Sequence, residues 1–342
     1  MRLIVPMGGR GTRLRPLSHT TPKALLPVSG RPTIARSLAA FADALPRPIQ
    51  EVVFVLSPSD EHTDVPDRLG AACRTVGVSA AFALQAEPLG TAHAIASAGE
   101  KLKGEVLTVW SDTLFQVARR ADLSEAPDLI AWTLDVADPR RFGVVARDGE
   151  GRVAGLVEKP PDARFTETLI GAYYVRQGEV LRDAIDRMLS EERMGAGGEY
   201  QLTDALDALV QSGARLQTEA VTEWLDVGTV PAYLDAVERV LDREGGAPDL
   251  GEDVTIRPPV FVDPEATVRR STLGPYVTVG AGATVTDADL RHAVVFEGAS
   301  VTGATLDGAV LGHRAVVEGA NGSVLVGDDA TVGVPLTSSP IG

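Results

Sequence analysis

Apolar and polar positions alternate along residues 1–243 in a way that predicts an α/β fold. Short apolar runs occupy residues 3–6, 52–56, 80–84 and 106–110, and each is compact enough to be a buried strand of a parallel sheet. Helical spacing of apolar residues is found between these runs, over residues 33–45, 67–76 and 91–102. This alternation of strand and helix predicts βαβ units with right-handed crossovers.

The next part of the chain predicts an extension of this sheet that is mixed and partly antiparallel. Strand-like runs follow one another here without a helix between them, over residues 129–136, 143–146, 153–157 and 169–175. Three helices are then expected, over residues 179–190, 203–211 and 231–243. Residues 1–243 are therefore predicted to form one domain with a Rossmann-like mixed sheet.

The pattern changes after residue 243. A glycine-rich stretch, 244–250, is a predicted linker. Beyond it, from Val262 to Val317, aliphatic residues recur at intervals of five or six, with Gly, Ala, Ser and Thr between them. This hexapeptide pattern is typical of a β-helix with three short strands per coil, whereas the strands of a β-sandwich repeat at about 8–12 residues. We expect a β-helix domain over residues 251–336.

Charge and composition narrow the classes of partner. The net charge of −15 predicts that the protein as a whole repels nucleic acid and anionic membranes. Residues 1–42 contain no acidic residue but seven basic ones, which suits a small polyanion. The one cysteine, Cys73, cannot form an intramolecular disulfide. We therefore expect a cytoplasmic protein that binds neither nucleic acid nor membranes.

Glycines and basic residues follow the first predicted strand. Gly8-Gly9-Arg10-Gly11-Thr12-Arg13-Leu14 lies where ligands of open α/β sheets bind, and Pro22-Lys23 precedes an apolar stretch. Glycines let backbone N–H groups approach phosphate oxygens, Thr12 adds a donor, and Arg13 and Lys23 supply positive charge. The spacing matches neither the Walker A loop nor the dinucleotide-binding fingerprint, which argues against an ATPase or a dehydrogenase.

A second motif, Gln85-Ala86-Glu87-Pro88-Leu89-Gly90, follows the third predicted strand and opens a helix. The amide of Gln85 has both donor and acceptor groups, so it can read the edge of a pyrimidine base, and Gly90 lets the backbone approach the same base. His93, in the helix that follows, is interpreted as a packing or capping residue and not as a catalyst.

These motifs resemble those of the sugar-1-phosphate nucleotidylyltransferases. Their order along the chain is similar to the order in glucose-1-phosphate thymidylyltransferases. The signature GGxGTRL followed by a Pro-Lys pair is present in order and spacing. The resemblance covers residues 1–240, and a hexapeptide tail that folds as a left-handed parallel β-helix is frequent in relatives. It implies phosphate binding by Gly8, Gly9, Gly11, Thr12, Arg13 and Lys23, and base recognition by Gln85, Leu89 and Gly90.

The resemblance also implies the sugar and metal sites. Asp112 and Asp226 of Trp224-Leu225-Asp226-Val227-Gly228-Thr229 are expected to bind the same Mg²⁺ ion, and Lys159 to bind the sugar phosphate. Glu158 is expected to bind sugar hydroxyls, and the sugar side also includes Gly143 and Tyr173. For the segment of residues 198–204, a further hydroxyl contact from Glu199 and a helix cap are equally open interpretations.

The implied reaction transfers a nucleotidyl group from a nucleoside triphosphate to a sugar 1-phosphate and releases pyrophosphate. Arg13, Lys23 and Lys159 are the expected catalytic residues, dTTP or UTP the favoured nucleotide and glucose 1-phosphate the favoured sugar. Mannose-1-phosphate guanylyltransferase and glucose-1-phosphate adenylyltransferase remain alternatives. So do a non-catalytic regulatory subunit and a second, acyl-transferring activity of the β-helix. The edge-rich β-helix predicts a homo-oligomer.

Overall fold

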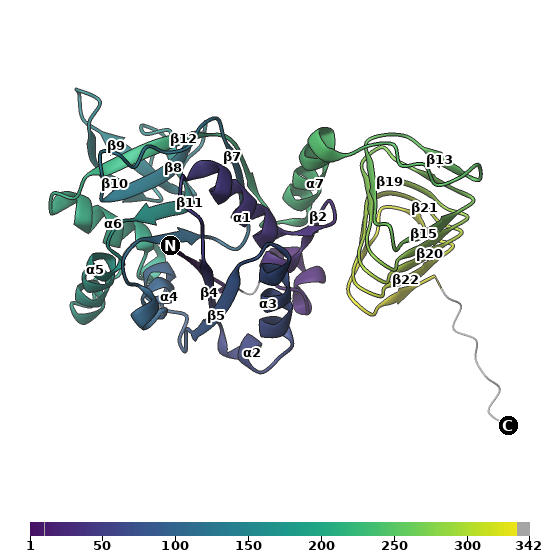
Figure 1. Ribbon diagram of the computed structural model, residues 1–342, viewed down its shortest axis with the longest axis horizontal. Coiled ribbons are helices and arrows are strands. Elements are labelled where there is room, and N and C mark those ends of the chain that lie inside the picture. Colours follow the sequence, from purple (N-terminus) through teal and green to yellow (C-terminus); the bar gives the residue numbers. More distant parts are fainter. Residues whose placement is uncertain (10, 334–342) are drawn as a thin grey trace. The chain divides into compact units, whose positions relative to one another are not determined.

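The computed structural model describes residues 1–9 and 11–333, which form two compact units (Figure 1). Of the described residues, the first unit comprises 1–9 and 33–225, and the second comprises 11–32 and 226–333. The predicted boundaries at 243 and 250 remain a prediction, and residues 334–336 of the predicted repeat domain lie outside the described part. No helix in the described ranges is long and apolar enough to cross a bilayer.

The first unit is built on a mixed ten-stranded sheet. Its main path runs β5-β4-β1-β6-β11-β8-β12-β7, and β10 and β9 extend from β11. The strands are β1 (Arg2–Pro6), β4 (Glu51–Leu56), β5 (Ser79–Leu84), β6 (Val106–Val109), β7 (Thr113–Val117), β8 (Leu129–Asp135), β9 (Gly143–Arg147), β10 (Val153–Glu158), β11 (Glu167–Val175) and β12 (Leu216–Asp226). β5, β4, β1 and β6 are parallel, whereas β11 is antiparallel to β6 and β8. The predicted mixed α/β sheet is confirmed.

Helices cover both faces of this sheet because its central strands β1, β4 and β6 are buried along nearly their whole length and are mostly apolar. The helices are α1 (Thr33–Ala44), α2 (Pro58–Glu61), α3 (Val65–Thr75), α4 (Thr91–Ala96), α5 (Gly178–Ser190) and α6 (Leu202–Gln211). On one face, Phe41 of α1 packs edge-on against Phe115 and Trp132. On the other, Ile4, Val53 and Ala131 share a buried cluster with residues of α4, α5 and α6.

Two expectations were wrong in detail. Residues 80–84 do not form a buried strand: β5 is at the edge of the sheet, and Phe82 is 44% exposed. The helix expected over residues 91–102 ends at Ala96 and is followed by a short 3₁₀ turn, Gly99–Lys101. β12 was not predicted, because polar residues at half-buried positions and the buried Glu219 interrupt the apolar–polar alternation that indicates a strand.

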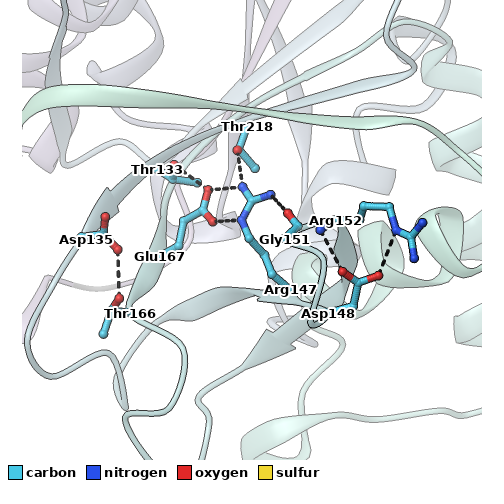
Figure 2. A network of polar contacts seen from close by, with 9 residues as sticks. All are labelled: Thr133, Asp135, Arg147, Asp148, Gly151, Arg152, Thr166, Glu167 and Thr218. Carbon is cyan, nitrogen blue, oxygen red and sulfur yellow. Dashed lines mark hydrogen bonds and ion pairs between the residues drawn. The ribbon is translucent and has the colours of Figure 1, made fainter.

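An ion-pair network ties together the antiparallel part of the sheet (Figure 2). Arg147 of β9 donates two hydrogen bonds to the carboxylate of Glu167 of β11, at 2.7 and 2.9 Å. The same guanidinium donates to Thr218 of β12 and to the Gly151 carbonyl, while Thr133 of β8 donates to Glu167. Four strands are thus linked through one bidentate pair.

The second unit contains a left-handed parallel β-helix, and the fold class predicted for this part is confirmed. Partner strands are offset by 17 residues in the first coils, where Val254 pairs with Ser271, and by 15 in the last, where Val310 pairs with Leu325. The strands are β13 (Val254–Ile256), β14 (Val260–Val262), β15 (Thr267–Arg269), β16 (Ser271–Leu273), β17 (Val277–Val279), β18 (Thr284–Thr286), β19 (Asp289–Val295), β20 (Ser300–Thr302), β21 (Thr305–Leu311), β22 (Val316–Glu318), β23 (Asn321–Gly322), β24 (Leu325–Val326) and β25 (Thr331–Val332). Inward aliphatic and alanine side chains fill its core.

The second unit also contains α7 (Val230–Glu244) and the N-terminal hairpin of β2 (Pro27–Val28) and β3 (Arg31–Pro32). Thr229 caps α7 by accepting a hydrogen bond from the Ala232 N–H at 3.3 Å. Tyr233 of α7 is fully buried, and its hydroxyl donates to the Pro27 carbonyl. The N-terminal segment, defined as residues 11–32, therefore packs with the C-terminal part of the chain.

Candidate functional site

The glycine-rich turn begins at the carboxyl end of β1. The Met7 N–H donates to the Val55 carbonyl at 2.9 Å and extends the strand pairing up to the first glycine. Gly9 has a φ of 110°, which favours glycine. A methyl group on Gly8 would lie 3.1 Å from Oε1 of Gln85. In the first unit, the predicted phosphate-binding and base-binding motifs are therefore neighbours.

The side chain of Gln85 is buried and held from two sides. Its Nε2 donates to the Gly90 carbonyl at 3.1 Å and lies 3.2 Å from Nδ1 of His93. Because an amide nitrogen can only donate, Nδ1 of His93 is the acceptor. This arrangement leaves the Gln85 amide oxygen directed toward Gly8.

Gly90 must be glycine for a second reason besides its φ of 124°. A methyl group there would lie 2.5 and 2.6 Å from the backbone oxygen and nitrogen of Tyr200. The Tyr200 N–H donates to the Leu89 carbonyl, and the Ala92 N–H donates to the Tyr200 carbonyl, both at 2.9 Å. Leu89 and Gly90 are thus fixed against the chain that precedes α6.

Four predicted phosphate-binding residues, Gly11, Thr12, Arg13 and Lys23, lie in the second unit. Thr12–Leu14 and Lys23–Leu25 are single 3₁₀ turns, and Ser18 of a third turn, Leu17–His19, donates from Oγ to the Gly11 carbonyl at 2.6 Å. A methyl group on Gly11 would lie 3.4 Å from Cε of Lys23. The stem of Lys23 therefore lies against the glycine turn, and Thr12 and Arg13 are exposed.

Asp226 and Arg13 both lie beside Gly228. A methyl group on Gly228 would be 2.8 Å from Oδ1 of Asp226 and 3.4 Å from a terminal nitrogen of Arg13. The second unit thus places a predicted metal ligand and a predicted phosphate-binding cation around one glycine. A larger residue at this position would displace one of the two side chains.

Asp112 lies in the first unit, in the turn between β6 and β7. The Trp110 N–H donates to the Gly171 carbonyl at 3.2 Å, and the Thr113 N–H donates to the Trp110 carbonyl at 3.1 Å. The ring of Trp110 covers Gly171, where a methyl group would lie 2.0 Å from it. Half-buried Asp112 therefore projects from a tightly fixed turn.

The residues predicted for the sugar side converge in the first unit. Thr203 of α6 donates to Oε2 of Glu158 at 2.6 Å, and a methyl group on Gly143 would come within 3.1 Å of both side-chain oxygens. Tyr173 of β11 is buried against them. Burial and the nearby Glu158 carboxylate raise the Tyr173 pKa far above its usual value, although a hydrogen bond with Thr203 opposes this.

Lys159 has a φ of 46° and projects beside this cluster, with Nζ 3.9 Å from the Glu158 carboxylate.

Burial, together with Glu158 and Asp207, raises the pKa of Asp204, while Arg193 opposes the shift. The segment that contains Glu199 includes the start of α6: Gln201 occupies its N-cap position, and the Leu202 N–H donates to Thr91 Oγ1 at 2.9 Å.

Each unit therefore assembles part of the predicted set, and the assigned roles remain predictions. Sequence patterns did not identify His93 as the partner of Gln85 or Thr203 as the partner of Glu158. The only local signal for Thr203 is its position in the first turn of a predicted helix. In the described residues, no group of three or more His, Cys, Asp or Glu side chains is arranged to hold a metal.

A mixed α/β sheet with a glycine-rich turn after β1 is followed along the chain by a left-handed parallel β-helix. A family model described as nucleotidyl transferase matches residues 3–243. The chain therefore belongs to the nucleotidyl transferase family and is an enzyme of that family.

Individual relatives match nearly the whole chain. Glucose-1-phosphate thymidylyltransferases of Streptomyces antibioticus and Streptomyces griseus are 27% and 29% identical, each over 88% of this chain and 89% of the relative. A mannose-1-phosphate guanylyltransferase of Mycobacterium tuberculosis is 28% identical, over 87% of this chain and 80% of the relative. The structure of a UDP-glucose pyrophosphorylase complexed with UDP-glucose is similar in fold (TM-score 0.57, 20% identity, 71% of this chain, 98% of that chain).

Proposed function

We propose that the enzyme transfers a thymidylyl group from dTTP to glucose 1-phosphate and releases pyrophosphate. The observation that carries the proposal is the buried Gln85 amide, fixed by Gly90 and His93 with its oxygen directed to the Gly8 turn. A rigid amide next to a phosphate-binding turn suits the edge of a pyrimidine. The two thymidylyltransferases that match 88% of this chain support the same choice.

The sugar 1-phosphate is itself the nucleophile. A phosphate monoester with a second pKa of about 6 is mostly dianionic at neutral pH. One of its oxygens forms a bond to the α-phosphorus of dTTP in line with the bond that breaks, and pyrophosphate leaves with that electron pair. No protein nucleophile is needed, so the side chains must bring two polyanions together and stabilise the charge that moves to the leaving group.

The described contacts suggest how the roles are divided. Lys159 binds the sugar phosphate, while Glu158 and Tyr173, fixed by Thr203, bind sugar hydroxyls next to Gly143. Gly8, Gly9, Gly11 and Thr12 hold the triphosphate, and Arg13 and Lys23 neutralise the departing pyrophosphate. Leu89 and Gly90 present backbone to the base.

Asp112 and Asp226 would hold Mg²⁺ as one carboxylate each. Magnesium is usually bound by one or two carboxylates together with substrate phosphates and waters, so two aspartates fit its chemistry. When bound, the ion neutralises charge on the triphosphate.

Three further points remain parts of the proposal. The protein is cytoplasmic, its β-helix originates from hexapeptide repeats, and it forms homo-oligomers through the β-helix.

The test is pyrophosphate release with Mg²⁺, crossing dTTP, UTP, GTP, CTP and ATP with glucose, galactose, mannose and N-acetylglucosamine 1-phosphates. The expected result is the highest kcat/KM for dTTP with glucose 1-phosphate. The Asp112→Asn variant is the control for contaminating activity and should be nearly inactive. Highest turnover with GTP and mannose 1-phosphate would instead establish the guanylyltransferase alternative, whose relative is equally similar. Turnover with no pair would contradict the proposed function.

A further inference from the structure

The last coil of the β-helix is hydrogen-bonded to the N-terminal segment. Oδ2 of Asp328 accepts hydrogen bonds from the hydroxyls of Thr20 and Thr21, the latter at 3.0 Å. Thr21 is completely buried. Oδ1 of Asp328 accepts from the His313 N–H at 2.8 Å, so the carboxylate itself is fixed to the coil below.

The N-terminal segment also touches the β-helix at other points along its length. Pro16 covers Gly327, where a methyl group would lie 3.1 Å from the proline Cβ. At the other end of the stack, the ring of Phe261 covers Gly30, where a methyl group would lie 2.3 Å from it. The contacts therefore run from the first coil to the last, and the segment is held at both ends.

Thr21, which donates a hydrogen bond to Asp328, lies two residues before Lys23 in the chain. Pro22 restricts the backbone between Thr21 and Lys23, and the Leu25 N–H donates to the Pro22 carbonyl at 2.8 Å. The Leu26 N–H donates to the Lys23 carbonyl at 3.1 Å and completes the turn. Because Thr21 is fixed, few backbone torsions between Thr21 and Lys23 are free to rotate, and the backbone of Lys23 is held in place.

We propose that Asp328 of the β-helix is a positioning residue for the triphosphate: it fixes Thr20 and Thr21 and thereby places Lys23. The proposal rests on the proposed function in assigning Lys23 to the triphosphate. It gives the β-helix an indirect part in nucleotide binding, in addition to any role in assembly. Asp328 touches no substrate, and its effect passes through the segment that it holds.

Three variants of the full-length protein test the proposal. Asp328→Ala removes both oxygens, and Thr21→Val removes one donor at nearly constant volume while it leaves the β-helix unchanged. The matched control is Asp329→Asn in the same coil, which weakens the exposed pair of Asp329 with Arg314 (2.6 Å) but no described contact to the N-terminal segment. Two quantities are measured for each variant: steady-state KM values for both substrates, and amide hydrogen exchange of residues 17–26.

Loss of hydrogen bonds to a charged acceptor should raise the KM for dTTP by about 10-fold in Asp328→Ala and somewhat less in Thr21→Val. The KM for glucose 1-phosphate should stay near the wild-type value, and exchange of residues 17–26 should accelerate in both variants. Asp329→Asn should match the wild type in both measurements. A merely structural role would lower kcat through loss of folded protein and leave both KM values unchanged.

The proposal is overturned if exchange of residues 17–26 is unchanged in both variants. It is also overturned if exchange accelerates while the KM for dTTP stays at the wild-type value. Inactivity of the wild-type protein with every substrate pair contradicts the proposed function instead, and the exchange measurement then still decides whether Asp328 holds the segment.

Discussion

Nε2 of Gln85 lies 3.2 Å from Nδ1 of His93, which is eight residues further along the chain and lies in α4. Since the same nitrogen also donates to the Gly90 carbonyl, both of its hydrogens are engaged and the amide cannot rotate without losing a hydrogen bond. His93 of α4 therefore fixes the side chain of Gln85, and under the proposed function it positions this amide for the base.

Replacement of His93 by Leu removes the acceptor and releases one side of the Gln85 amide. Because one neutral hydrogen bond contributes about 0.5–1.5 kcal/mol, the KM for dTTP should rise by about 2- to 12-fold. The KM for glucose 1-phosphate should not change. Steady-state kinetics with one substrate varied at a time measures both, and His62→Leu, at a histidine whose side chain is 89% exposed, is the matched control. An unchanged KM for dTTP would show that Gln85 does not depend on His93.

A second prediction concerns Gly90. Alanine there would combine a φ of 124° with a methyl group 2.5 Å from the Tyr200 carbonyl oxygen, so the backbone must move. Strain of this kind costs about 1–3 kcal/mol, and the Gly90→Ala variant should unfold at a lower urea concentration and bind dTTP more weakly. The control is Gly213→Ala, which has a φ of 96° but no atom within 4 Å of the added methyl group. Equal losses in the two variants would refute a specific effect of the Tyr200 contact.

Short-range patterns were sufficient to predict most of the fold. Apolar runs located β1, β4 and β6 and the helical periodicity located α1, α5 and α6, because burial on one face imposes a regular spacing. The five- and six-residue spacing likewise predicted the β-helix. β12 was not predicted as a strand because polar residues at half-buried positions interrupt its alternation of apolar and polar residues.

The parts of the site that sequence alone could not reveal are contacts between distant segments. Asp328 and Thr20 are 308 residues apart, and neither belongs to a recognisable motif. No local pattern connects Thr203 with Glu158 either, since their hydrogen bond depends on how α6 packs against β10. Motifs identify residues that contact substrate, whereas partners that orient these residues become visible only in the fold.

Thr203 provides a third prediction. Thr203→Val preserves the volume but removes the hydroxyl that donates to Glu158 and interacts with Tyr173. Loss of a hydrogen bond to a charged acceptor should raise the KM for glucose 1-phosphate by about 10-fold, with little effect on the KM for dTTP. The matched control is Thr168→Val, a buried threonine whose hydroxyl donates only to the Thr166 carbonyl in the described structure. A KM change for dTTP alone would contradict the placement of this cluster on the sugar side.

The last prediction concerns stability and its dependence on pH. Burial acts to raise the pKa of Glu167, but the hydrogen bonds with Arg147, Thr218 and Thr133 outweigh it and hold this pKa below its usual value. A carboxyl whose pKa is lowered by folding contributes stability above its unfolded-state pKa of 4.5, and the contribution is lost as the pH falls through the lower folded-state pKa. Because Arg147 is 36% exposed and partly screened by solvent, Glu167→Gln should cost about 1–2 kcal/mol at pH 7.

Urea unfolding of the wild type and Glu167→Gln across the range from pH 7 to about pH 3 measures this difference. The difference in the free energy of unfolding between the two proteins should be largest at pH 7. It should decrease as the carboxyl of the wild type becomes protonated. Glu150→Gln is the matched control, because its pair with Arg152 has both side chains at least 70% exposed and should contribute little at any pH. A gap for Glu167→Gln that does not narrow at low pH would mean that packing, and not the ion pair with Arg147, accounts for the loss.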